Sequence, residues 1–130
     1  MTYNLTPIQK TEAKIIACLL NDYGTQQPSP WVFCDGILTQ QDFSYPMNQW
    51  YFAAISDMHA ERLASTTPLD VVEYKLRKGE QPTKQLMMYG INLVAALDRL
   101  EDLVWGNNID LRQLVTELIN YNYGARNLTI

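Results

Sequence analysis

Residues 46–58, which read PMNQWYFAAISDM, decide the fold of this chain. The apolar residues of this stretch recur at intervals of three and four, which places them on one stripe of an α-helix. A proline stands at residue 46, where the first position of a helix tolerates it because no backbone N–H is needed there. Six residues form the predicted stripe: Met47, Trp50, Tyr51, Ala54, Ile55 and Met58.

The same helical spacing recurs on both sides of this stretch. On the N-terminal side, residues 1–10 are predicted to be an extended lead-in, and Thr11 is predicted to cap a helix that stops before Gly24. On the C-terminal side, a helix is predicted over residues 69–78. The residues predicted to face inward from that helix are Leu69, Val72 and Leu76.

Two more helical patterns cover residues 84–104 and 109–122, with a tight turn between them. Because this connection is short, the two helices are predicted to lie antiparallel as a hairpin. No stretch alternates in the way that is typical of a β-strand. The prediction is therefore an all-α fold in one domain of residues 1–130, with a compact multi-helix head over about 7–82 and a C-terminal helical hairpin over about 84–122.

The predicted hairpin carries apolar residues on more than one side, because a second set stands beside the row that contains Leu93 and Leu100. A hairpin with more apolar surface than its own domain covers is a candidate dimerisation element, and closed two-fold pairing is the commonest way to cover it. The alternative is that both sets pack into one ordinary core. The candidate self-association surface consists of Met87, Ile91, Val94, Leu111, Leu114 and Leu118.

The charge of the chain argues against direct binding of nucleic acid. The formal net charge is −4, whereas binding through phosphates needs a basic face. The densest basic run, Lys75-Leu-Arg77-Lys78, stands at the end of a predicted helix, where cations complement the helix dipole. The longest apolar stretch is only a few residues, so we predict no membrane span and a cytoplasmic location.

Cys18 and Cys34 stand among apolar neighbours and are predicted to be buried free thiols. One pair of cysteines is too few for a secreted disulfide framework. Two cysteines and one histidine also fall short of the four closely spaced ligands of a zinc site. No glycine is followed by lysine, as a P-loop requires.

Two pairs of residues were weighed as catalytic groups. Cys34 and His59 could form a thiolate–imidazole pair, but a buried thiol and a surface or capping histidine are the favoured interpretation. Asp42 and Asp70 could be paired acids, but each stands just before a helical segment, where capping favours Asp. We therefore predict no enzyme, no catalytic residue, no metal and no cofactor.

Three stretches of the chain, considered together, resemble a known family. The first is the helix Glu12–Asp22, the second runs from Leu38 to Ile55 and contains Asp42-Phe43, and the third runs from Pro68 to Gly79. In order and spacing they are similar to the N-terminal domain of DnaB-type replicative DNA helicases, over roughly residues 7–80. The chain departs from the family where Ala17 replaces a glycine and Asn48 replaces a histidine, and its hairpin matches only in general character.

The resemblance implies an all-helical head and a helical hairpin that pairs between subunits, without an ATPase motor. It implies a non-enzymatic protein–protein interaction and oligomerisation module of DNA replication, similar to the helicase collar domain. The expected partners are a second copy of the chain and a replisome protein such as primase, helicase or loader. The alternative is a phage- or plasmid-type regulatory helical protein that mimics the helicase domain and competes for its partners.

Overall fold

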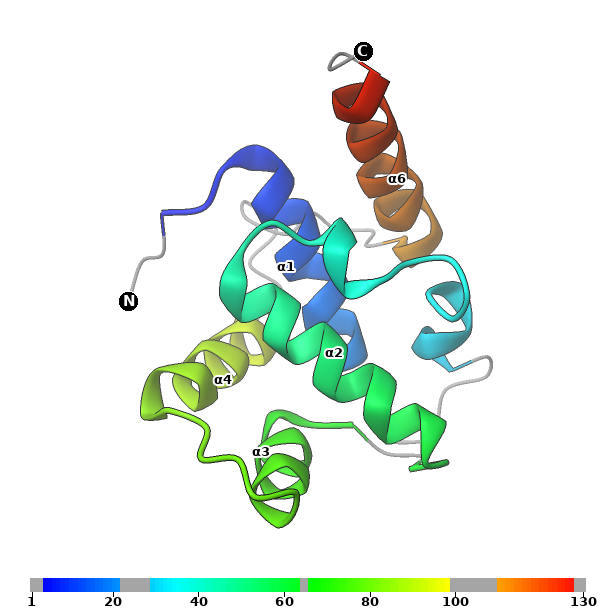
Figure 1. The fold of residues 1–130 in the computed structure, drawn as a ribbon. Helices are drawn as coiled ribbons and strands as arrows, with labels where there is room; N and C mark the ends of the chain where they lie inside the picture. The colour runs from blue at the N-terminus through cyan, green and yellow to red at the C-terminus, as the bar shows by residue number, and fades with distance from the viewer. Residues whose placement is uncertain (1–3, 22–28, 64–65, 99–109, 128–130) are drawn as a thin grey trace.

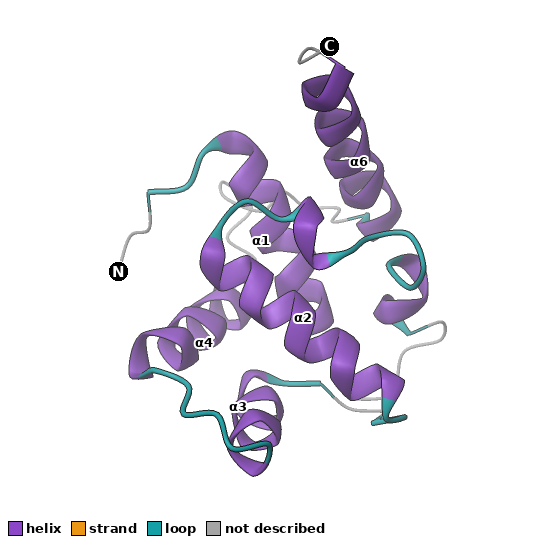
Figure 2. Ribbon diagram, viewed as in Figure 1, coloured by secondary structure: helices purple, strands orange, loops and turns teal. Residues whose placement is uncertain are grey.

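The structure is a computed structural model that describes residues 4–21, 29–63, 66–98 and 110–127. These residues fold into helices joined by turns and short loops, without a β-strand (Figure 1, Figure 2). The predicted all-α class is therefore confirmed. The elements are α1 (Pro7–Leu19), η1 (Pro30–Phe33), η2 (Gln40–Asp42), α2 (Pro46–Ala60), α3 (Pro68–Arg77), α4 (Lys84–Asp98) and α6 (Leu111–Asn127), where η marks a 3₁₀ helix.

Helix α1 begins at Pro7, so the prediction of an extended lead-in through residue 10 is wrong. Thr6 and Gln9 form a capping box: the Gln9 amide donates to Thr6 Oγ1 at 3.3 Å, and the Thr6 amide donates to Gln9 Oε1 at 3.1 Å. This reciprocal pair satisfies two backbone donors at the helix start, and Pro7 needs none. Thr11 lies inside the helix and caps nothing.

Helix α2 has the predicted stripe, with Tyr51, Ala54, Ile55 and Met58 buried and Met47 and Trp50 partly buried. Phe52 lies off this stripe and is buried as well, because its ring packs against two aromatic rings from preceding segments. The ring centroids of Phe43 and Phe52 are 4.7 Å apart, and those of Trp31 and Phe52 are 5.5 Å apart. α2 is therefore covered on more than one side.

Helix α3 faces the core with a different side from the one predicted. Leu69 and Leu76 are exposed, whereas Val71, Val72 and Tyr74 are buried. The helix carries apolar residues on two sides, and its packing against α2 and α4 selects the side that contains the valines. The predicted inward positions of Leu69 and Leu76 are therefore corrected.

Helix α1 lies at the centre of the fold and packs against α2, α4, α6 and η1 (Figure 1). Leu19 and Leu20 at its C-terminal end join one hydrophobic core with Phe43, Tyr51 and Ile55, as predicted. Trp50, predicted for the same core, packs at its edge instead.

Helices α4 and α6 pack on α1 from different sides (Figure 1). Residues 99–109, which include the predicted turn of the hairpin, lie outside the described residues. The hairpin over residues 84–122 therefore stays a prediction. α6 continues to Asn127 instead of ending at residue 122.

Candidate interaction surface

A buried carboxylate fixes the start of α2 against α1. Glu12, only 1% exposed, accepts hydrogen bonds from the Ser44 amide at 2.9 Å, the Ser44 hydroxyl at 2.8 Å and the Tyr45 amide at 3.1 Å. The Asn48 side-chain amide donates to the same carboxylate at 3.2 Å. Amides just before a helix have no partner within it, so Glu12 acts as a cap for α2 supplied by another helix.

The same network reaches α4. Asn48 is fully buried, and its side-chain oxygen accepts a hydrogen bond from the hydroxyl of Tyr89, which is buried on α4. A buried amide oxygen without a partner destabilises a fold, so this bond restricts how α4 sits on α2.

A close approach at Gly90 sets the position of α4 more tightly. A Cβ at this residue would overlap the Tyr51 hydroxyl and lie 3.2 Å from Cβ of Pro68. The Tyr51 hydroxyl donates to the Leu86 carbonyl, one turn before Gly90 on α4. Glycine is therefore required here by the crossing of α4 over Tyr51, although glycine weakens a helix interior.

An apolar groove of about 440 Å³ lies between the start of α3 and the outer side of α4. Two of its large side chains are strongly exposed, Leu69 at 59% and Ile91 at 43%. Aliphatic side chains exposed together in a hollow mark an interaction site more often than single exposed ones do. The groove is lined by Thr67, Pro68, Leu69, Met87, Ile91, Val94 and Ala95.

Three of the residues predicted for self-association therefore lie together in this groove: Met87, Ile91 and Val94. Leu114 and Leu118 do not join them, because both are buried in the core where α6 packs on α1. A surface that includes these two leucines is not available in this fold, and that part of the prediction is corrected. Leu111 is partly buried against the same core.

The sequence interpretation missed the α3 side of the groove. Leu69 was assigned to the core, and nothing in its helical spacing distinguished it from Val72. The Thr67 hydroxyl accepts a hydrogen bond from the Asp70 amide at 3.2 Å and fixes the start of the helix, but only the packing of α3 on its neighbours selects the buried side. With α3 starting at Pro68, Leu69 lies one position from the buried row of Pro68, Val71 and Val72.

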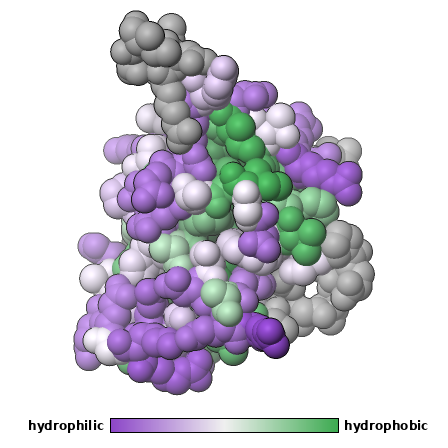
Figure 3. Space-filling model, turned by 45° about the vertical axis from the view of Figure 1, so that its right-hand side comes forward, coloured by the Kyte–Doolittle hydropathy of each residue, from purple (hydrophilic) through white to green (hydrophobic). Residues whose placement is uncertain are grey.

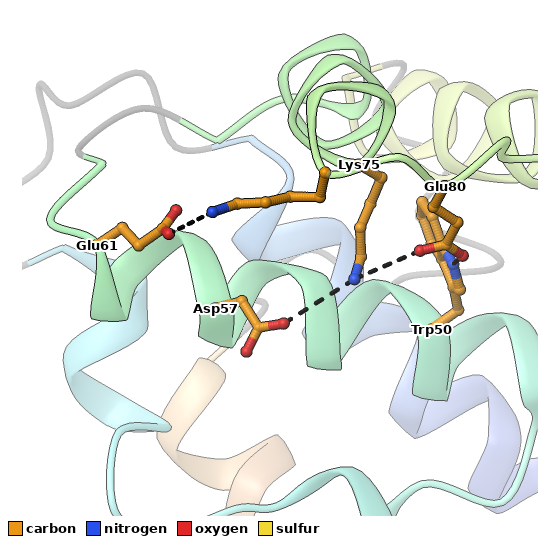
Figure 4. Close-up of polar contacts among 6 residues, drawn as sticks. Trp50, Asp57, Glu61, Lys75 and Glu80 are labelled. Carbon is orange, nitrogen blue, oxygen red and sulfur yellow. Dashed lines mark hydrogen bonds and ion pairs between the residues drawn. The ribbon is translucent and has the colours of Figure 1, made fainter.

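Ion pairs join the C-terminal end of α3 and the residue after it to α2 (Figure 4). Lys78 Nζ lies 2.6 Å from Glu61 Oε1, and Lys75 Nζ lies 3.4 Å from Glu80 and 3.9 Å from Asp57. The hydrogen bond from Lys78 lowers the pKa of Glu61, and the same bond raises the pKa of Lys78. Two of the three cations in the basic run at the end of α3, Lys75 and Lys78, are therefore paired with carboxylates.

Trp50 completes this contact from α2. Its indole N–H donates to Glu80 at 2.7 Å, and this bond together with nearby Lys75 lowers the pKa of the Glu80 carboxyl (Figure 4). The indole is amphipathic, and a partner at the surface explains why the ring lies at the edge of the core. These contacts orient α3 more than they stabilise it, because exposed ion pairs contribute little free energy.

The residues weighed as catalytic groups have other surroundings. Burial raises the pKa of Cys34 to about 12 and that of Cys18 to about 11, which is opposite to the activation of a thiolate nucleophile. His59 lies in the last turn of α2, as predicted, and stacks on Trp31 with 4.9 Å between ring centroids. Both cysteines are free, with Cys34 buried and Cys18 partly buried.

The two aspartates lie inside helices and not just before them as predicted: Asp42 is the last residue of η2, and Asp70 lies in α3, whose N-cap is Thr67. Asp42 forms a capping box with Thr39, whose amide donates to Asp42 Oδ2 at 2.8 Å. Asp70 lies in the first turn of α3, where its charge complements the helix dipole. In the part of the chain that the structure describes, no three His, Cys, Asp or Glu side chains are grouped as metal ligands. No helix in that same part is long and apolar enough to cross a lipid bilayer.

A second apolar strip is visible on the face that α6 and η1 share (Figure 3). These elements and the turn after η1 leave three aliphatic side chains exposed, Val32, Ile37 and Ile119. The Arg112 guanidinium lies 5.0 Å from the centroid of the Phe33 ring, and the Asn122 amide donates to the Asp42 carbonyl at 2.9 Å. These contacts hold the segment from η1 to η2 along α6.

Comparison with protein-family models, with curated proteins and with solved structures finds no match to this chain. The resemblance to the helicase domain therefore rests on the residues quoted above and stays a prediction.

Proposed function

We propose that this protein is a protein–protein interaction module of DNA replication, similar to the helicase collar domain, and that it self-associates through the α3–α4 groove. The observation that carries the self-association is the groove itself. It unites three residues selected from the sequence for this role, and it exposes Leu69 and Ile91 side by side with smaller apolar side chains. The assignment to replication is supported by the family resemblance over the head.

The groove suits a protein interface because its walls are fixed before a partner arrives. The buried bond between Tyr89 and Asn48 and the close crossing at Gly90 hold α4 in place, and packing against α2 and α4 holds α3. A preformed surface loses less conformational entropy on binding than one that must order itself. Fewer compensating contacts are therefore needed for a stable complex.

The proposed partner in self-association is a second copy of the chain, arranged by a two-fold axis. In such a dimer the same groove, with Leu69 and Ile91, is used on both subunits. A stable interface of this kind buries over ~1,000 Å² in total, counting both subunits. The groove must then be the centre of a larger contact that includes the outer faces of α3 and α4.

Analytical ultracentrifugation of the purified protein, from micromolar to near-millimolar concentration, tests self-association. We expect a monomer–dimer equilibrium in the unmodified protein and a monomer for Ile91→Asp. Ile119→Asp is the matched control, because it places the same charge at an isoleucine of similar exposure on α6, at 37% against 43%. The control should dimerise normally. A monomer at every concentration, or equal loss of dimer in both variants, contradicts the proposal.

The replication assignment needs a separate measurement. Immobilised protein is exposed to purified replicative helicase and primase from the native cell, and binding is followed by biolayer interferometry. We expect micromolar or tighter binding to at least one of them. The absence of binding to both would overturn the replication assignment and leave self-association intact. If the chain instead disrupts a preformed helicase–primase complex, the competing regulatory protein is the better description.

A further inference from the structure

We draw no further inference here: the strongest candidate outside the proposed site, the strip of exposed aliphatic residues Val32, Ile37 and Ile119 where η1 and its following turn lie along α6, carries nothing because no feature of the structure shows what covers it.

Discussion

Helices α4 and α6 both pack on α1, but they differ in what their other sides expose. α6 places Leu114 and Leu118 in the core, and among its described side chains the exposed large hydrophobic ones are one isoleucine and two tyrosines, whose hydroxyls suit contact with water. α4 places Tyr89 in the core, and its opposite side contributes four of the seven residues that line the groove.

This difference shows that apolar content alone does not identify an interaction surface. The sequence assigned both helices to the same surface because both have apolar residues at helical spacing. The fold separates them: α1 covers the leucines of α6, whereas α3 borders the outer row of α4 without covering it. Leucines in α6 should therefore govern stability, and outer residues of α4 should govern association.

The largest effect is expected for α6. Leu118 is 0% exposed, so Leu118→Ala should lower the free energy of unfolding by about 2–5 kcal/mol through lost burial and a cavity. Urea denaturation followed by circular dichroism measures this loss. Leu111→Ala, at a partly buried position of the same helix, should cost less. Equal losses at the two positions would show that α6 is not docked as described.

The crossing of α4 over α2 should be the next most sensitive point. Gly90→Ala forces a methyl group against the Tyr51 hydroxyl, and such overpacking costs about 1–3 kcal/mol. The better helix propensity of alanine offsets part of this loss, by about 1 kcal/mol. Combining Gly90→Ala with Tyr51→Phe should reduce the cost only in part, because the hydroxyl is removed while the ring carbon that bore it stays 2.7 Å from the added Cβ. Thermal denaturation of the four proteins in this double-mutant cycle gives the coupling, and strict additivity would contradict the described contact.

A loss of similar size is expected at the buried hydrogen bond between α4 and α2. Tyr89→Phe keeps the ring but removes the donor to Asn48, so the free energy of unfolding should fall by about 1–3 kcal/mol at most. Tyr121→Phe on the exposed face of α6 is the control and should change nothing measurable. Chemical denaturation compares the stability of the two variants. An unchanged midpoint for Tyr89→Phe would show that the bond to Asn48 does not stabilise the packing of α4.

The smallest effect on stability is expected at the outer side of α4. Ile91→Asp replaces a side chain that is 43% exposed, and surface changes of this kind stay within about 0.5 kcal/mol when measured in the monomer. The free energy of unfolding should be measured at low micromolar concentration, where the proposed dimer contributes least. A loss above about 2 kcal/mol would show that Ile91 belongs to the core. The outer side of α4 would then govern stability, as the leucines of α6 do, and not association.

The sequence predicted most of α2 and of the central core, because most of their apolar residues fall on one stripe with a clear helical period, whereas Phe52 is buried off that stripe. It failed at α3, where leucines and valines occupy two sides and only tertiary packing selects between them. It also placed the start of α1 too late, because Thr6 and Gln9 were not recognised as a capping box. For both α3 and α1, the sequence pattern alone fits more than one structure.

The candidate site was predicted in part. Met87, Ile91 and Val94 follow from the excess of apolar residues on one helix, whereas Leu69 requires knowledge of which helix lies beside it. The role of Glu12 could not be predicted from the sequence. Its actual partners lie more than thirty residues further along the chain, at Ser44, Tyr45 and Asn48, and no local pattern indicates them.

The Glu12 carboxylate has a consequence for the cooperativity of unfolding. Because it supplies the cap of α2 from within α1, neither helix keeps its full set of bonds when the other leaves. Opening that exposes the Ser44 or Tyr45 amide to solvent must separate α1 from the start of α2. These two amide protons should therefore exchange with solvent deuterium as slowly as the amide protons in the core of α1. Without the bond to Glu12, Ser44 would exchange quickly, like a loop residue, because it lies on the surface.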